Sequence, residues 1–222
     1  METLRGLWHV IGAELKPIEL VAAATSLLCV YLTVKNNIWN WFWGLIGCVL
    51  YGYIFFAVSH IYANAGLQFF YFVPMQFLGW YVWLKGNPQK NDALPVTALS
   101  TRARLFWIAA TLALTVALYF GLPPVVAAFH LPPQVLSWMD CLTTGLSISA
   151  QYLQTYKKFE NWILWIVADL IYTFYIFPQL KMPVTTGLYA VFTVLAVIGA
   201  RDWYRLMRAS PSHVPPTTPD PI

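Results

Sequence analysis

The chain has 222 residues, of which 59% are hydrophobic, 17% aromatic and only 10% charged. Soluble domains carry about a quarter charged residues, so this composition indicates a protein that resides in lipid. The formal net charge of +4 is small and scattered, which argues against a nucleic-acid-binding protein. The three cysteines and four histidines are widely spaced, and we expect no disulfide framework and no metal site.

Seven apolar segments have the length that a membrane-spanning helix needs, which is about 20 residues. Lipid offers no partner to backbone polar groups, so we expect each segment to be helical and the fold to be all-α. In chain order, the expected spans are residues 18–34, 41–58, 65–84, 105–121, 135–156, 162–180 and 184–200.

Prolines and polar residues mark where these helices end or distort. Pro74 and Pro178 lie inside the third and sixth spans, and we expect each to kink its helix. We expect residues 85–104 to form the longest inward-facing loop. The residues from 210 onward lack core-forming side chains, which predicts a disordered tail. Between the fourth and fifth spans, we expect the chain to break at Gly121, Pro123, Pro124, Pro132 and Pro133.

Basic side chains predict the orientation, because cytoplasmic loops of membrane proteins are enriched in Lys and Arg. With seven spans, one side of the membrane holds Arg5, Lys16 and Lys181. The other ten of the 13 basic residues fall on the opposite side. We therefore expect the amino terminus outside the cell and the carboxyl terminus in the cytoplasm.

The chain also matches itself at a constant offset of 121 residues. The identical pairs are Ser26 with Ser147, Tyr31 with Tyr152, Leu32 with Leu153, Asn40-Trp41 with Asn161-Trp162, Tyr51 with Tyr172, Phe56 with Phe177, and Gly66-Leu67 with Gly187-Leu188. Four crossings separate the members of each pair, so both copies point the same way through the bilayer. Parallel repeats are one of the known transporter plans. We expect two three-helix repeats joined by a linker helix, in a three plus one plus three arrangement.

This arrangement divides the chain into five parts. Residues 1–17 are expected to form an extracytoplasmic segment, and residues 18–104 the first three-helix bundle with its cytoplasmic loop. Residues 105–134 supply the linker helix and an outer loop, residues 135–208 the second bundle, and residues 209–222 the cytoplasmic tail.

Polar and aromatic side chains recur at helical spacing on three spans. Steps of three and four residues place each set on one helix face, and polar groups in lipid are costly enough to face a cavity or a partner. We expect these faces to line one pocket. They carry Asp140, Thr144, Ser147, Gln151 and Gln154 on the fifth span, Trp162, Trp165, Asp169 and Tyr172 on the sixth, and Gln68, Tyr71 and Gln76 on the third.

Structural explanations compete for several of these residues. Thr144 and Ser147 are the right kind of residue for simple hydrogen bonds between helices, and Asp140 is well placed to cap its helix. Asp169 differs, because it lies seven residues into the sixth span and no Lys or Arg lies deep in any span to neutralise it. The positions of Trp165 and Asp169 are Gly and Cys in the first copy, so we expect the second copy to supply most specific contacts.

The chemistry of this residue set favours a cationic ligand. A carboxylate beside aromatic faces suits a cationic ring, because the ring quadrupole attracts positive charge. Glutamine amides suit a carboxamide or ribose hydroxyls. The sequence has no phosphate-binding loop, nucleophile–base pair or metal motif, so we expect no catalytic residue and no cofactor, and a membrane enzyme is the weaker hypothesis.

Three stretches carry a resemblance to a known family. Residues 157–169, Lys-Lys-Phe-Glu-Asn-Trp-Ile-Leu-Trp-Ile-Val-Ala-Asp, resemble the most characteristic element of the PnuC family of bacterial vitamin transporters. Residues 40–47, Asn-Trp-Phe-Trp-Gly-Leu-Ile-Gly, and 77–83, Phe-Leu-Gly-Trp-Tyr-Val-Trp, look like the family's first-copy motifs. The resemblance covers about residues 18–205.

The resemblance implies a fold similar to that of the sugar transporters called SWEETs and a place in the bacterial inner membrane. It implies transport of nicotinamide riboside, with thiamin or riboflavin for some relatives, by facilitated diffusion that a cytoplasmic kinase maintains by phosphorylating the product. The pyridinium cation, carboxamide and ribose of that ligand agree with the expected pocket. The site residues that the resemblance implies are Gln151, Trp162, Trp165, Asp169 and Tyr172, together with Gln68, Gln76 and Asp140.

We therefore predict a nicotinamide riboside transporter that works by alternating access. Two alternatives stay open: a transporter of another vitamin, such as thiamin or riboflavin, and a seven-helix receptor or sensor. The expected partners are nicotinamide riboside and the lipid bilayer. The sequence does not decide whether the chain forms a homo-oligomer, couples transport to an ion, or favours one conformation.

Overall fold

The computed structural model describes residues 17–54, 56, 62–86, 94–130, 138–179 and 183–209. The predictions for residues 1–16, for prolines 132 and 133 and for the tail after residue 209 lie outside this part of the chain. Its elements are α2 (Pro17–Val34), α3 (Asn40–Tyr53), α4 (Tyr62–Leu67), the π-helical turn η2 (Gln68–Phe72), α5 (Val73–Lys85), α6 (Thr101–Ala128), α7 (Trp138–Thr155), α8 (Asn161–Ile171), the π-helical turn η3 (Tyr172–Ile176), α9 (Phe177–Gln179) and α10 (Pro183–Ala209).

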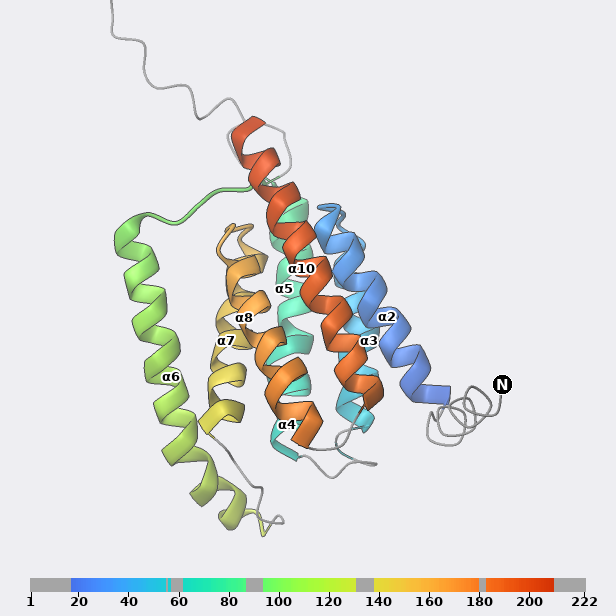
Figure 1. Cartoon of the computed structure of the whole chain (residues 1–222), viewed down its shortest axis with the longest axis vertical. Coiled ribbons are helices and arrows are strands. Elements are labelled where there is room, and N and C mark those ends of the chain that lie inside the picture. Colours follow the sequence, from blue (N-terminus) through green and yellow to red (C-terminus); the bar gives the residue numbers. More distant parts are fainter. Residues whose placement is uncertain are drawn as a thin grey trace, which may run out of the picture.

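These elements form seven helical stretches, because α4, η2 and α5 are continuous, as are α8, η3 and α9 (Figure 1). The prediction of an all-helical, seven-helix chain is confirmed for the described residues. Three stretches are long and apolar enough to cross a membrane by length and composition alone, namely Pro17–Val34, Thr101–Val125 and Asn161–Gln179.

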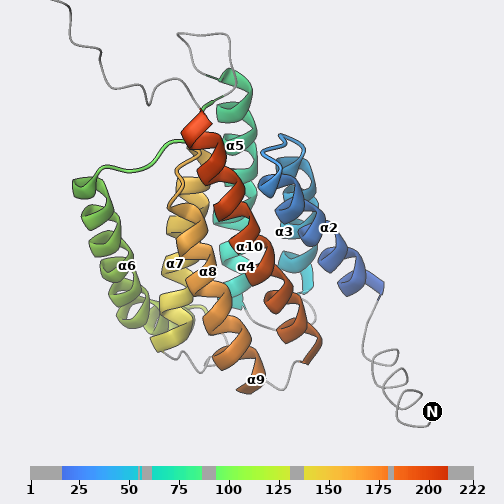
Figure 2. The ribbon, with the colours of Figure 1, turned by 45° about the horizontal axis from the view of Figure 1, so that its top comes forward.

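Helix α10 lies between α2 and α8, while α6 lies at the edge of the molecule and packs against α7 (Figures 1 and 2). Small and hydroxyl side chains bring α6 and α7 together, as where the hydroxyls of Thr111 and Ser149 lie 2.7 Å apart and where Thr115 meets Gly145. Much of the rest of α6 is exposed and apolar, including Leu105, Phe106 and Phe120. An apolar surface of this extent is typical of a contact with a membrane or with another protein.

Helix α6 runs through Gly121, Pro123 and Pro124 and ends only at Ala128. The expected break at these three residues is therefore wrong. Proline removes one backbone donor but its fixed φ suits a helix, and helices in membranes tolerate it. The helix changes direction in its lower part and then continues (Figure 1). Helix α10 also extends beyond its predicted span, to Ala209, because hydropathy marks the lipid-facing part of a helix and not its end.

A π-helical turn lies directly before each of the two mid-span prolines. In η2 the N–H of Val73 bonds to the carbonyl of Gln68, and in η3 the N–H of Phe177 bonds to the carbonyl of Tyr172. Each donor is the residue before a proline, Pro74 or Pro178. A π turn holds one extra residue within an α-helix and commonly marks a kink. Each proline thus follows a distorted turn, and the kinks at Pro74 and Pro178 stay predictions.

The α2–α3 and α7–α8 turns have the same backbone geometry. Asn36 has φ 53° and Lys157 has φ 48°, the left-handed conformation that ends many helices. The next residue in each turn donates its N–H to the carbonyl five residues back, at 2.9 Å in both. Asn40 and Asn161 each donate from Nδ2 to the carbonyl three residues back, at 2.6 Å in both. Both turns lie at one end of the bundle, which we call the turn end (Figure 1).

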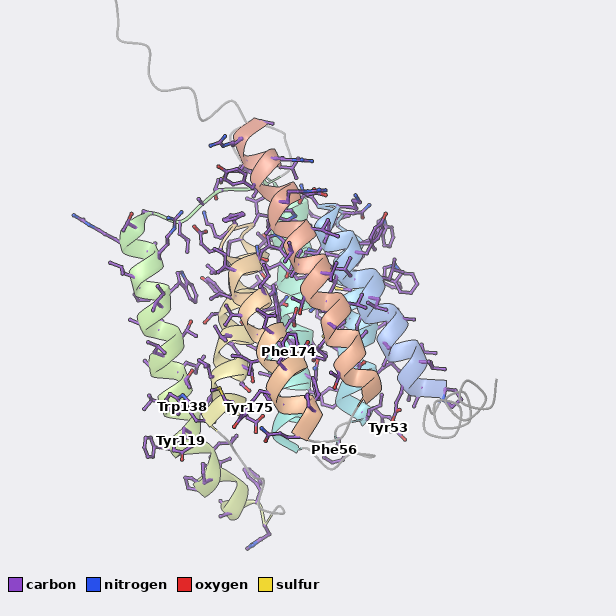
Figure 3. The ribbon with its side chains drawn as sticks, viewed as in Figure 1. Tyr53, Phe56, Tyr119, Trp138, Phe174 and Tyr175 are labelled. Carbon is purple, nitrogen blue, oxygen red and sulfur yellow. The ribbon has the colours of Figure 1, made fainter. Side chains whose placement is uncertain are left out.

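Four buried tryptophans form the core at the turn end. The rings of Trp41 and Trp83 meet edge-to-face with centroids 5.3 Å apart, and those of Trp162 and Trp203 do the same at 5.4 Å. Trp83 and Trp203 join the two pairs at 6.1 Å. Val96, from the segment before α6, is buried against this cluster. The opposite half of the bundle displays exposed aromatic side chains, among them those labelled in Figure 3, as membrane interfaces favour.

The tryptophan cluster also ties the first and second halves of the chain together. Trp83 of α5 donates from Nε1 to the carbonyl of Thr155 on α7, at 3.1 Å. Trp203 of α10 donates from Nε1 to the carbonyl of Thr33 on α2, at 3.0 Å. Buried indole N–H groups usually find a partner, and those of Trp83 and Trp203 find one on the other half of the chain, whereas Nε1 of Trp41 and of Trp162 has none among the described residues. The two bonds hold the halves of the chain together at the turn end.

Candidate functional site

Asp169 is the most informative predicted residue, because it is a buried acid in an apolar helix. Its side chain lies on α8 and the residue is only 6% exposed. The structure gives its carboxylate no hydrogen bond and no ion pair within the described part of the chain. Taking an isolated carboxylate out of water costs many kcal/mol unless a partner compensates. This carboxylate therefore calls for a cation or for hydrogen-bond donors beyond the described residues.

Aromatic rings lie beside this acid. Tyr172, three residues after Asp169, stacks on Phe177 with ring centroids 5.2 Å apart. Tyr189 of α10 lies 4.8 Å from both of those rings. Tyr189 is also within electrostatic range of Asp169. A carboxylate with several aromatic rings around it is a favourable environment for an organic cation.

Tyr189 was not among the residues predicted from the sequence. Its ring joins α10 to the site on α8, yet a single tyrosine on an apolar helix has the appearance of an ordinary core or interface residue. The repeat contains a usable signal, because the counterpart of Tyr189 at the offset of 121 is Gln68, which was predicted.

Trp165 is held in place by a residue of α7. Its Nε1 donates to Oε1 of Gln154 at 3.0 Å, and Gln154 is 7% exposed. Trp165 and Asp169 are four residues apart, so they lie on the same face of α8. Gln154 belonged to the predicted polar face of α7 but not to the predicted binding residues, and its role here is to position the indole.

Two predicted glutamines carry buried polar atoms without partners. Oε1 of Gln68 and Nε2 of Gln151 have no hydrogen bond within the described residues. Their helices meet where the Tyr71 hydroxyl donates to the carbonyl of Ile148 at 2.6 Å. Gln68 and Tyr71 are three residues apart, as are Ile148 and Gln151, so the two amides lie near this contact. Unsatisfied buried groups are rare in native proteins and mark places where a ligand or water binds.

Gln76 makes its contacts within the first half of the chain. It is buried, and its Nε2 donates to Sγ of Cys48 on α3 at 3.8 Å. Its Oε1 lies against Gly44, where any side chain would collide with it. Gly44 and Cys48 are the counterparts of Trp165 and Asp169, so this amide occupies the corresponding place in the first copy.

No described contact brings the remaining predicted residues to Asp169. Asp140, in the first turn of α7, and Thr144 are half-buried, and no described hydrogen bond brings either of them to Asp169. Asp140 does lie within electrostatic range of Tyr172. Trp162 belongs to the tryptophan cluster at the turn end, where its ring packs on Gly199 and Trp203. Among the described residues, no group of three His, Cys, Asp or Glu is placed to hold a metal ion.

Comparisons with known proteins agree with one another. The model of the family described as "Nicotinamide mononucleotide transporter" matches residues 16–205. The chain is 30% identical over 215 residues to the nicotinamide riboside transporter PnuC of Escherichia coli strain K12, covering 89% of each chain. It is 25% identical over 202 residues to the protein of that name from Haemophilus influenzae, covering 91% of this chain and 85% of the relative. A crystal structure of the vitamin B3 transporter PnuC superposes with a TM-score of 0.71 at 25% identity, covering 93% of this chain and 88% of that one.

Proposed function

Because the chain belongs to the nicotinamide mononucleotide transporter family, we propose that it carries nicotinamide riboside across the inner membrane into the cell. The observation that carries the proposal is the buried carboxylate of Asp169, which has no partner of its own within the described residues. Nicotinamide riboside brings a pyridinium cation to that carboxylate. Burying the two charges together offsets part of the cost of burying either one alone.

The family is described by the mononucleotide, but the carboxylate of Asp169 favours nicotinamide riboside as the ligand. A mononucleotide adds a phosphate group, which requires basic partners when it is buried. The described ion pairs involve Lys35, Arg104 and Arg201, and none of these reaches Asp169. A phosphate near Asp169 would add repulsion between like charges in a medium of low dielectric constant. The site therefore suits the ligand that lacks the phosphate.

We assign the binding contacts as follows. Asp169 pairs with the pyridinium ring, which lies among the rings of Trp165, Tyr172 and Tyr189. The amides of Gln68 and Gln151, whose buried atoms lack partners within the described residues, bind the carboxamide and the ribose hydroxyls. Further residues of the pocket wall are Tyr71, Gln76, Asp140 and Thr144, and Trp162 supports the helix from the tryptophan cluster.

Transport follows from two parallel three-helix repeats that move around this site. The identical turns and the paired tryptophans support the repeat, which joins α2–α5 to α7–α10 through the linker helix α6. Later in the repeat the offset between equivalent residues falls from 121 to 120. Trp83 is equivalent to Trp203 and Gly79 to Gly199, because each makes the same kind of contact with a tryptophan ring in its own copy. The π turn η2 accounts for the change, because it adds one residue to the third helix of the first copy.

Alternating access requires that each end of the bundle close in turn. The tryptophan cluster and its two hydrogen bonds between the halves close the turn end in this conformation. With the amino terminus outside, as the basic residues predict, the turn end faces the cytoplasm. Entry of the cation gains about 2.3 kcal/mol per 100 mV of inside-negative potential. Phosphorylation by a cytoplasmic kinase would then keep the free riboside low.

A binding titration tests the proposal. Purified protein is titrated with nicotinamide riboside, nicotinamide mononucleotide, thiamin and riboflavin. We expect the riboside to bind most tightly, and the mononucleotide at least tenfold more weakly because of its phosphate. Tighter binding of thiamin, whose thiazolium is also a cation, would support a cation site at Asp169 but would show that the substrate is thiamin and not nicotinamide riboside. Tighter binding of the mononucleotide would contradict the electrostatic argument.

A further inference from the structure

The turn end contains a pocket that is separate from the site around Asp169. Its volume is about 420 Å³, which is large enough for a small organic ligand. It lies where the two matched turns meet α5, whereas Asp169 lies eight residues into α8, roughly 12 Å along the helix axis. The pocket is lined by Asn36, Asn37, Ile38, Trp39, Trp83 and Lys157.

Lys157 brings a buried positive charge to this pocket. The residue is 2% exposed, and its Nζ lies 4.1 Å from the centre of the Trp83 ring. It forms no ion pair within the described part of the chain, where Glu160 pairs with Arg104 and Asp202 with Lys35 and Arg201. Burial lowers the pKa of Lys157 to about 8, so most of its charge remains at neutral pH. Among the described residues, no acceptor is found for the three N–H groups of this buried ammonium, which lies on an indole face.

Asn36 supplies the complementary group. Its side chain comes from the matching turn of the first copy, and its Oδ1 is buried with no hydrogen-bond donor among the described residues. The pocket therefore presents a cation that needs an acceptor and an oxygen that needs a donor. Trp39, which is 54% exposed, adds a flat apolar wall. The matching ligand is an anion that also carries a hydroxyl group.

We propose that this pocket binds a phosphate group, with Lys157 paired to a phosphate oxygen and Asn36 accepting from a hydroxyl of the ligand. The phosphate comes either from a soluble phosphate monoester or from the headgroup of an anionic phospholipid. Either ligand would hold Lys157 against Trp83, whose Nε1 closes the turn end through Thr155. Binding would therefore stabilise the closed turn end. This inference does not depend on which vitamin the Asp169 site carries.

The test measures thermal unfolding of the full chain in detergent free of phospholipid, followed by tryptophan fluorescence. The probes are inorganic phosphate, adenosine 5′-monophosphate and phosphatidylglycerol, compared with chloride at equal ionic strength, adenosine and phosphatidylcholine. We expect a saturable rise in melting temperature with at least one phosphate probe and not with its control. A rise with the first two probes identifies a soluble ligand, and a rise with phosphatidylglycerol alone identifies lipid.

Two variants keep the test decisive. Lys157→Gln should raise at least tenfold the ligand concentration that gives half of the rise in melting temperature, because it removes a hydrogen bond between charged groups. Lys158→Gln should leave that concentration unchanged, because Nζ of Lys158 binds Thr97. Asn36→Asp should place a carboxylate opposite Lys157, raise the melting temperature without ligand and abolish the response to phosphate. No saturable response to any probe, or an equal response in Lys157→Gln, would overturn the proposal.

Discussion

The Nε1 of Trp165 donates a hydrogen bond to Oε1 of Gln154 at 3.0 Å, and this bond fixes an indole of α8 against α7. The ring is thereby held on the face of α8 that also carries Asp169, one turn further along. A ring that is already ordered loses little side-chain entropy when a ligand binds. Gln154 is therefore a positioning residue for the aromatic part of the site.

Replacing Trp165 by Phe should weaken nicotinamide riboside binding. The variant keeps an aromatic ring but loses the bond to Gln154, which then keeps a buried acceptor without a donor. Without that bond the ring must be ordered when the ligand binds, which costs about 0.5–1.5 kcal/mol, so we expect the dissociation constant to rise roughly two- to tenfold. Isothermal titration calorimetry measures it. Trp107→Phe, on the ring that packs against Tyr152, is the matched control and should bind normally. If Trp165→Phe bound the riboside with wild-type affinity, the indole of Trp165 would not be part of the binding site.

Replacing Asp169 by Asn should separate charge recognition from shape. The variant is nearly isosteric but neutral, so it should lose affinity for the cationic riboside by about tenfold or more. Affinity for reduced nicotinamide riboside, whose ring is uncharged, should change much less. Titrating both ligands against both proteins makes the comparison. An equal loss for the two ligands would show that Asp169 does not pair with the ring charge.

Alanine at Gly79 or Gly199 should destabilise the protein. A methyl group at Gly79 would collide with the ring of Trp41, and one at Gly199 with the ring of Trp162. Overpacking of this kind costs about 1–3 kcal/mol, so the melting temperature of the purified protein should fall. Gly187→Ala is the control, because nothing lies within 4 Å of a methyl group there. A melting temperature in either variant equal to that of Gly187→Ala would contradict the close packing of tryptophan on glycine.

Glu160 should contribute more to stability than the acid in the other described ion pairs. Its carboxylate accepts from Arg104 at 2.8 Å and from the backbone N–H of Leu99, which ties the segment before α6 to the α7–α8 turn. Glu160→Gln should lower the free energy of unfolding by about 1–2 kcal/mol. Asp202→Asn should cost less, because its partners Lys35 and Arg201 are largely exposed. Thermal unfolding of the two variants compares them, and a larger loss in Asp202→Asn would reverse this order.

Hydropathy and spacing predicted the number and approximate limits of the helices, because the lipid solvent requires long apolar segments. They failed at Pro123 and Pro124, where composition alone suggests a break while a membrane helix accommodates both residues. They also missed the register change at η2. Pro74 predicted a distortion but not the extra residue of the π turn, which the matching of Gly79 with Gly199 and of Trp83 with Trp203 at an offset of 120 reveals.

The site was predicted in part for the same reason. An acid such as Asp169, far from any basic residue in the sequence, is recognisable without a structure because its burial is so costly. Partners from distant helices are not, so Tyr189 was absent from the predicted set, and Gln154 was placed on the predicted polar face without its bond to Trp165 being foreseen. Trp162 shows the opposite problem. It shares a helix face with Asp169, yet its depth along the helix places it in the tryptophan cluster.

The most direct test of the central claim is the equilibration of radiolabelled nicotinamide riboside into liposomes that contain the purified protein, with Asp169→Asn reconstituted in parallel. We predict that label enters until the inner and outer concentrations match, and that the variant loses at least tenfold in initial rate. Ligand that binds without equilibrating would identify a receptor instead of a transporter, and equal rates for the two proteins would place the site elsewhere.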